Sequence, residues 1–416
     1  MLTGNMIRTD KWPLQVNPQQ HQMMLDTVAE YRRFCRALSI IILNQWPHLA
    51  QQDNFAAAVE RLIHPTQINP SPRHRYFAKR FYKFPSYLRR AAIEFCRGQV
   101  SSYLTRYERW RSGIRQRRTA RPPVFNPDAG CYPALYKGQL IKFDEHLAVA
   151  SIKLWDGKEW LWHEVPVQRK RKRHLLGQMK SPSLVVGSRR CHLSMPFQIK
   201  PDRLPTGKIV AAFDLGMNTL ATGSLISRDG TVAGRVFLNP AADIDRRNRQ
   251  ADLIRQKARK TVKLSRGFCK GHYRKARHIN EHIAQIISRQ MVDWALLHQV
   301  SVIVLENLKG WRPRGGKKGS SLKQRFHHWL HRRLADLVRD KFREAGGRVE
   351  FVYPRGTSAW AYDGSGKVSR DKDQYELATF KTGKLYNADL SASYNIGARY
   401  WACKLKLTHR KDGQLP

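Results

Sequence analysis

Two short apolar runs, each ended by a single acidic residue, place the strongest constraint on how this chain folds. One run is Val210-Ala-Ala-Phe and ends at Asp214, and the other is Val302-Ile-Val-Leu and ends at Glu306. Short apolar runs of this kind are typical of strands buried on both faces. A charged residue in such a place costs free energy unless it is paired or binds a metal ion. The two runs therefore predict buried strands that carry carboxylates to a polar site.

The order of elements after residue 207 predicts the fold class of the second half. Three successive strands are followed by strands that alternate with helices, which is the order expected of an α/β sheet of RNase H type. The expected elements are strands at 208–215, 219–226 and 231–238, a helical hairpin at 241–299, a strand at 300–308, a helix at 322–345 and a strand at 348–353.

The first half of the chain has a different pattern. Apolar residues recur at helical spacing from Leu25 to Ile42 and again from Leu88 to Trp110, which predicts a helical subdomain. From about Arg121 apolar and polar residues alternate, and Asp156-Gly157 predicts a hairpin turn between two strands. We expect this β-rich part to form a small barrel.

The charge of the chain indicates its partner. The sequence contains 76 Lys and Arg against 32 Asp and Glu, a formal net charge of +44. Such an excess repels itself unless much of it faces a polyanion, and counterions released from phosphates then contribute affinity. Aromatic residues interleave with the arginines and can stack on bases. Nucleic acid is therefore the expected partner; binding to acidic lipid, or basicity that serves only solubility, is the alternative.

Membrane and zinc signals are missing from the sequence. No apolar stretch reaches the roughly 18 residues of a membrane span, and no signal-peptide pattern begins the chain, so we expect a cytoplasmic protein with no membrane partner. The cysteines occur singly, without a CxxC pair, which predicts reduced thiols rather than disulfides or a cysteine zinc site. They are Cys35, Cys96, Cys131, Cys191, Cys269 and Cys403.

A third acid completes the predicted site. Asp389 begins a helix of small residues that is expected to pack close to the sheet. Alone, Asp389 would be interpreted as a helix cap or a structural salt bridge. Together, three carboxylates in acid-poor segments predict one or two Mg2+ ions, with Mn2+ as an alternative, and cleavage of phosphodiester bonds. No glycine-rich phosphate-binding loop is present, which disfavours ATP-driven and dinucleotide-dependent enzymes.

Three segments carry a family resemblance. They are FDLGMNTLAT around Asp214, VIVLENLKG around Glu306 and NADLSASYNIGARY around Asp389. In this order and context they resemble the TnpB transposon-associated nucleases and the compact type V CRISPR effectors related to them. YPRGTS from Tyr353 and residues 14–38 are also similar.

The resemblance implies an RNA-guided, Mg2+-dependent DNA endonuclease. Asp214, Glu306 and Asp389 would be its catalytic and metal-binding residues in a single RuvC-like site. A structured guide RNA would pair with one strand of double-stranded target DNA, beside a short target-adjacent motif read by the protein. The protein would act as a monomer or as a homodimer on one guide RNA. Whether the guide comes from a CRISPR array or a transposon end stays open.

The resemblance also implies a fold: an RNase H-like (RuvC) nuclease domain with a degenerate zinc-ribbon-like insert, preceded by a β-barrel wedge domain that carries a helical recognition insertion. The implied parts are a first wedge strand at 1–18, a helical recognition domain at 19–118, the wedge β-barrel at 119–206, the nuclease domain at 207–357 and 387–408, the insert at 358–386 and a tail at 409–416.

The insert departs from the family. Where the family carries two CxxC pairs, residues 358–386 contain no cysteine, so no zinc is expected. We expect the insert to keep a ribbon-like β shape through glycine turns and aromatic packing. Its aromatic residues are interpreted as a substitute core, with base stacking as the alternative. They are Trp360, Tyr362, Tyr375 and Phe380.

Other candidates are less specific. Arg355 and Asn395 lie beside the motifs and would either orient a phosphate or an acid, or serve packing at a strand end or a helix. His327, His328 and His331 show no further metal-binding partner. The basic run at 169–173 is a weak contact candidate. The helical hairpin is expected to contribute guide or target contacts, with the candidates Lys257, Arg259, Lys260, Lys263, Arg266, Lys270, Arg274 and Arg277.

Two other functions remain open on the sequence. One is an RNA-guided DNA-binding protein without cleavage, such as a repressor or a transposition-targeting subunit, although three intact acids disfavour it. The other is an unguided RNase H-like transposase or resolvase. About 200 residues without a recognisable helix-turn-helix precede the nuclease segment, and RNA binding explains them better.

Overall fold

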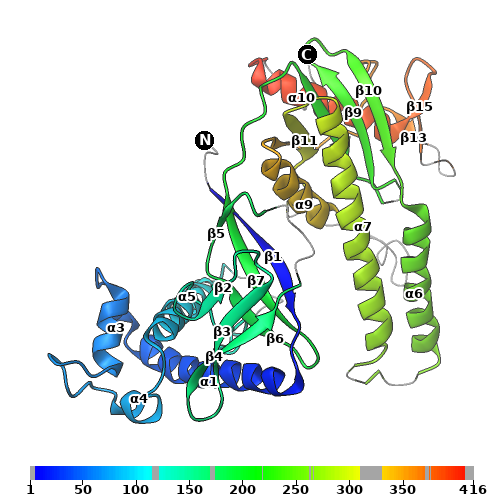
Figure 1. Ribbon diagram of the computed structural model, residues 1–416. Coiled ribbons are helices and arrows are strands. Elements are labelled where there is room, and N and C mark those ends of the chain that lie inside the picture. Colours follow the sequence, from blue (N-terminus) through cyan, green and yellow to red (C-terminus); the bar gives the residue numbers. More distant parts are fainter. Residues whose placement is uncertain are drawn as a thin grey trace. The chain divides into compact units, whose positions relative to one another are not determined.

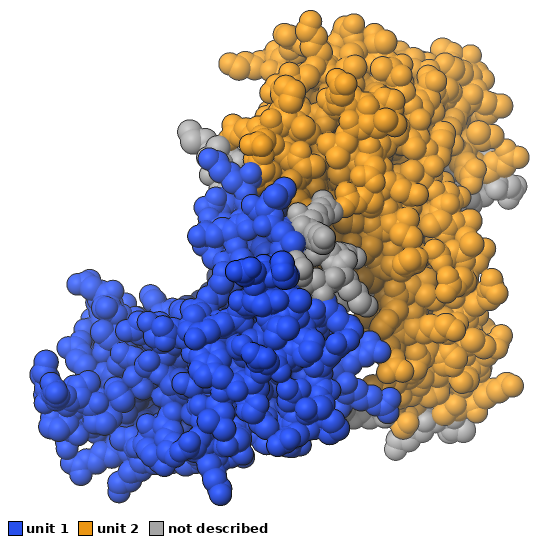
Figure 2. Space-filling model, in the orientation of Figure 1, with its two compact units in different colours: residues 1–200 blue, residues 201–416 orange. Residues whose placement is uncertain are grey.

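The chain divides into two units, residues 1–200 and residues 201–416 (Figure 2). The computed structural model describes residues 5–114, 121–168, 174–217, 219–261, 264–265, 267–309, 330–370, 374 and 376–407. Within these residues no helix has both the length and the apolar character that a membrane crossing requires. Several sequence candidates lie outside the described residues, namely the run at 169–173, Lys263, Arg266, His327, His328, Tyr375 and the tail at 409–416.

Two long helices organise the first unit (Figure 1). Helix α1 (Pro18–Asn44) begins with a capping box, in which Asn17 and Gln20 bond each other's backbone amides. Helix α5 (Ser86–Arg111) begins directly after Pro85 and packs on α1. Three shorter helices lie between them in the sequence: α2 (Trp46–Leu49), α3 (Phe55–Ile63) and α4 (Arg75–Arg80). The predicted helical subdomain is therefore present.

The strands of the first unit form two antiparallel sheets. The expected hairpin at Asp156 is confirmed, because the Asp156 carboxylate accepts the amides of Lys158 and Glu159 and Gly157 has φ of 105°. An isolated bridge between Leu14 and Val167 joins the sheets, and the barrel itself stays a prediction. One sheet contains β2 (Ile141–Phe143), β3 (Val149–Trp155) and β4 (Trp160–Pro166); the other contains β1 (Met6–Leu14), β5 (Gln178–Met179), β6 (Ser183–Val186) and β7 (Cys191–Ile199).

The second unit is built on a five-stranded mixed sheet whose order is β10-β9-β8-β11-β12. The first three strands are antiparallel neighbours, whereas β8, β11 and β12 run parallel. This arrangement agrees with the RNase H type predicted from the element order. The strands are β8 (Ile209–Asp214), β9 (Ala221–Ser227), β10 (Val232–Leu238), β11 (Val302–Glu306) and β12 (Arg348–Val352).

Helices cover both faces of this sheet (Figure 1). On one face, α7 (Lys270–Leu297) and α9 (His331–Glu344) enclose a core with Phe213 and Leu305, and α6 (Ala241–Arg259) packs on α7. On the other face, α10 (Ala388–Lys404) packs against β8 and β9. A Cβ on Gly397 of α10 would lie 2.5 Å from the Ile226 side chain. The expected close approach of this small-residue helix is therefore confirmed.

The insert before α10 forms a three-stranded ribbon of β13 (Ser369–Arg370), β14 (Leu377–Thr379) and β15 (Leu385–Asn387). Phe380 is buried in a small hydrophobic cluster that is separate from the other cores. Its ring meets Tyr362 edge-on, with ring centroids 5.7 Å apart. These two residues therefore pack together as expected, and their substitution for a zinc site stays a prediction. Trp360 instead lies over Gly356, outside that cluster. The helical hairpin expected at 241–299 is present as α6 and α7, and of the helix expected at 322–345 the described residues contain α9.

Candidate active site

Asp214 and Glu306 end neighbouring parallel strands at the same edge of the sheet. The register pairs Leu305 with Phe213, so the two acids, each one residue further along, are level with one another. Because side chains alternate along a strand, both acids continue the row that faces α10. Both residues are half-buried. The sheet thus brings together two carboxylates that are far apart in the sequence.

Asp389 reaches this edge from the first turn of α10. It does not cap the helix, because the Asn387 side chain accepts the Leu390 amide at 2.8 Å. The segment after Asp214 runs close to it: a Cβ on Gly216 would lie 3.8 Å from Asp389 Oδ2 and only 2.3 Å from the Thr219 carbonyl oxygen. Glycine at 216 therefore permits the close approach, and the cap interpretation of Asp389 was wrong.

The three carboxylates repel one another in a partly desolvated site. Burial raises the pKa of Asp214 well above its ordinary value, and the charges of Glu306 and Asp389 raise it further. Burial also raises the pKa values of Glu306 and Asp389. Carboxyl groups with raised pKa values resist ionisation until a cation offsets their charge. The site is therefore electrostatically suited to a positively charged ligand.

Two arginines that the sequence reasoning missed offset part of this charge. Arg370, at the end of β13, lowers the pKa values of both Asp214 and Asp389. Arg399 of α10 does the same for Glu306 and donates to the carbonyl oxygens of Tyr353 and Arg355, the latter at 3.1 Å. Arg399 could have been found, because it is a base in a small-residue helix segment. Arg370 had no such signal among the many bases of the chain.

Glu306 is held by a loop that α10 supports. The buried Thr357 hydroxyl donates to Glu306 Oε1 and also lies 3.0 Å from the Pro354 carbonyl oxygen. The amide of Asn395 donates to the Thr357 carbonyl at 2.8 Å and to the Trp360 carbonyl at 2.7 Å. Asn395 thus holds the loop of Thr357 rather than an acid directly. The Arg355 side chain is exposed, and Arg355 takes part through its carbonyl.

The donor set suits a hard divalent cation. Carboxylate oxygens are the ligands that Mg2+ and Mn2+ prefer, and mutual repulsion among the acids would be relieved by such an ion. The acids are not drawn together around one ion in this structure: within the described residues, no three Asp, Glu, His or Cys side chains are grouped closely enough to hold a metal.

A pocket of about 580 Å3 adjoins the acids, and Glu306 is among its lining residues. Leu215 and Phe351 give it apolar surface, and 41% of Phe351 is exposed. Lys309 and Arg332 also line it, as do Asp336 and Arg339, which form an ion pair. The apolar surface suits the flat base of a nucleotide, and the two basic residues Lys309 and Arg332 suit its phosphate.

The basic candidates of the helical hairpin lie away from the sheet. Figure 1 shows α6 and α7 extending from the sheet to their connection at the far end. Lys257 lies 3.0 Å from His272, and no acid pairs with the other described candidates. The exposed candidates near that connection are Lys257, Arg259, Lys260, Lys270, Arg274 and Arg277.

The strand order of the second unit is that of an RNase H-like fold, and three acidic residues lie at one edge of its sheet. Comparisons with known proteins show which sequences this chain resembles. The model of the Aq_aa04 family matches residues 8–156. The TnpB-like protein aq_aa05 of Aquifex aeolicus (strain VF5) is 28% identical over 150 residues, which are 34% of this chain and 48% of that protein. The chain thus matches about half the length of this curated relative.

A comparison with solved structures finds a similar fold. The structure of a Cas12f1-sgRNA-target DNA complex has a TM-score of 0.52 and 11% sequence identity, covering 94% of this chain and 99% of that chain. The resemblance to TnpB proteins and compact type V effectors is therefore confirmed, at the level of fold for the effectors.

Proposed function

We propose that this chain is an RNA-guided DNA endonuclease whose active site is formed by Asp214, Glu306 and Asp389. One observation carries the proposal: three half-buried acids, two of them on level neighbouring strands, have pKa values raised by burial and Asp214 also by its two partners. A structural role does not require such an arrangement, because it destabilises the fold.

The three acids would hold Mg2+, or Mn2+ in its place. When bound there, the ion would offset the charge of the phosphodiester and supply a more acidic water molecule. Arg370 would add positive charge beside Asp214 and Asp389. The pocket of Leu215, Phe351 and Arg332 would hold the neighbouring nucleotide of the strand to be cut, so that its phosphate lies over the acids.

The guide RNA and the target DNA are proposed from other observations. The net charge of +44 favours polyanionic partners. The relative is TnpB-like by name, and the similar solved fold was determined with a guide RNA and target DNA. We also propose that this chain recognises a target-adjacent motif and contains the wedge and recognition domains. It would act as a monomer or homodimer on one guide RNA.

To test the proposal, the protein is purified with its bound RNA and also freed of RNA, and both preparations are assayed for DNA cleavage. A discrete RNA should copurify, and DNA matching it should be cut only with Mg2+ or Mn2+. Asp214→Ala should abolish cutting while RNA and target binding stay nearly intact. Asp252→Ala, which removes an exposed acid from α6 of the same unit, is the matched control and should cut normally.

Other outcomes would select the alternatives. Guided binding with no cleavage by the wild type would identify a DNA-binding protein such as a repressor or targeting subunit. Cleavage without any RNA would identify an unguided nuclease. Equal loss of binding and cutting in Asp214→Ala would mean that the acids are structural.

A further inference from the structure

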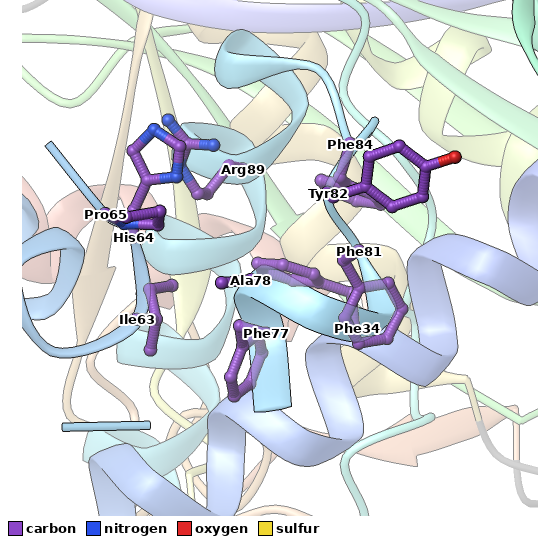
Figure 3. A pocket seen from close by; sticks show the side chains of 10 residues that line it. All are labelled: Phe34, Ile63, His64, Pro65, Phe77, Ala78, Phe81, Tyr82, Phe84 and Arg89. Carbon is purple, nitrogen blue, oxygen red and sulfur yellow. The ribbon is translucent and has the colours of Figure 1, made fainter. Parts of the chain in front are cut away.

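A pocket in the first unit is lined by aromatic rings from α1, from α4 and from the segment between α4 and α5 (Figure 3). Its volume is about 80 Å3. Phe34 of α1 stacks on Phe84 with ring centroids 4.3 Å apart, and it meets Phe77 and Phe81 edge-on at 5.1 Å. Ala78, on α4, completes the wall next to Phe77. The rings are held rigidly by one another, so the pocket has a defined flat-walled shape.

One side of the pocket is polar. His64 and Arg89 lie there together in Figure 3, away from Tyr82 and Phe84. Arg89 Nε is 3.3 Å from Glu60 Oε1, and only 12% of the Arg89 side chain is exposed. Burial, together with the positive charge of Arg89, holds the pKa of His64 below its ordinary value. A neutral imidazole offers both a donor and an acceptor, as the hydrogen-bonding edge of a base requires.

The segment that forms the pocket carries exposed bases. Arg73, Arg75 and Lys79 are exposed, whereas Arg80 and Lys83 are paired with Glu30 and Glu159. Tyr82 lines the pocket and is 73% exposed, so its ring is available to cover whatever enters. The positive charge is complementary to a polynucleotide backbone passing over the opening.

We propose that this pocket binds one unpaired base of a single-stranded nucleic acid. The base stacks on the exposed ring of Tyr82, and its edge points into the pocket toward His64 and Arg89. The flanking phosphates meet Arg75 and Lys79.

Homopolymeric oligonucleotides and an abasic strand test the site in the full-length protein. Fluorescence anisotropy would measure the Kd of labelled oligothymidylate, oligodeoxyadenylate and an abasic strand of equal length, with oligouridylate added to separate RNA from DNA. Wild type should bind oligothymidylate about tenfold more tightly than the abasic strand, the order expected from one stacked base. Oligodeoxyadenylate should also bind more tightly than the abasic strand, because its bases can stack on Tyr82.

Two variants and one matched control isolate the pocket. Ala78→Met fills it without a change of charge, and Tyr82→Ala removes an exposed ring without disturbing the core; each should abolish the tenfold preference. Tyr76→Ala removes a tyrosine that is 57% exposed in the same basic segment but does not line the pocket, and it should keep the preference. The salt dependence of binding should be equal in all four proteins, because phosphate contacts are unchanged.

The proposal is overturned if wild type binds the thymidylate and abasic strands equally, or if Ala78→Met keeps the preference. Equal losses in Tyr76→Ala and Tyr82→Ala would also overturn it, because stacking would then be diffuse. The inference rests on the proposed function only for its nucleic-acid partner. Loss of the base preference would leave cleavage through Asp214 untouched, and a failure of Mg2+-dependent cutting would leave the preference measurable.

Discussion

At the scale of single residues, Asp214 places function and stability in conflict. Its carboxylate is desolvated and faces two others, so the folded state is less stable while all three are charged. We expect Asp214→Asn, measured in EDTA at pH 7.5, to raise the free energy of unfolding by about 1 kcal/mol and Tm by about 2–4 °C. The exposed Asp252 provides the control variant Asp252→Asn, for which no gain is expected.

The pH dependence of this gain has a defined sign. Because the pKa of Asp214 is higher in the folded than in the unfolded protein, its contribution to stability falls as pH rises through the raised value. Below that range wild-type Asp214 is protonated and resembles asparagine. The difference in Tm between wild type and Asp214→Asn should therefore shrink toward acid pH. A difference that grows toward acid pH would show that the carboxylate is stabilising.

Thr357 gives a second prediction at this scale. Its hydroxyl is the donor that orients Glu306, so Thr357→Val should remove the hydrogen bond while keeping the shape of the side chain. We expect cleavage to need a higher Mg2+ concentration, by about tenfold, with the rate at saturating Mg2+ less affected. Thr357→Ser keeps the hydroxyl and should restore the wild-type Mg2+ dependence. An equal defect at every Mg2+ concentration would indicate general damage to the loop.

At the scale of elements, the ribbon of β13, β14 and β15 is expected to depend on aromatic packing. Phe380 and Tyr362 occupy its centre, with Phe380 only 2% exposed. Phe380→Ala should lower the free energy of unfolding by about 3 kcal/mol. Leu385→Ala, in the same ribbon, removes an apolar side chain that is 65% exposed and should cost much less. Chemical denaturation would measure both.

The same ribbon predicts a metal content. Protein purified without added zinc should contain no stoichiometric zinc, and a zinc chelator should leave the stability of the ribbon unchanged. Elemental analysis on the full chain, together with the denaturation curve in chelator, would check this. One zinc ion per chain would contradict the expectation that aromatic packing alone holds the insert.

The sequence predicted what local pattern encodes. The strands that end at Asp214 and Glu306 and the hairpin at Asp156 each follow from neighbours along the chain. Arg370 reaches the acids only because the ribbon folds back toward the sheet, and no spacing encodes that. Asn395 was noticed beside a motif, but its carbonyl partners depend on the loop that α10 supports.

The cysteines of the first unit illustrate the same limit. In the sequence they are single and widely separated, yet folding gathers Cys35, Cys96 and Cys131 into one buried place. The thiol of Cys96 donates to the Cys35 carbonyl at 3.5 Å. Burial and side-chain hydrogen bonds with the other two thiols raise the pKa of Cys35 well above its ordinary value. They are free and buried, as the sequence led us to expect, but their grouping required the packing of α1 on α5.

At the scale of the whole molecule, basic residues and hydrophobic cores occur in both units, whereas the candidate metal site belongs to one. Bases occur throughout both units, whereas the three candidate metal-binding acids all lie in the second. Each unit also has its own hydrophobic core, with Phe34 in one and Phe213 in the other. Polyanions and divalent cations should therefore act on the stability of the two units in different ways.

Differential scanning calorimetry would separate these effects. We expect two unfolding transitions, of which Val59→Ala lowers the one belonging to the first unit and Phe380→Ala the one belonging to the second, since each removes a buried side chain. Mg2+ should raise only the second transition, because a ligand stabilises the unit that binds it, by about 2.7 kcal/mol at 100 times its Kd. Asp214→Asn should abolish that shift. Equal Mg2+ shifts of both transitions would place the ion elsewhere on the chain.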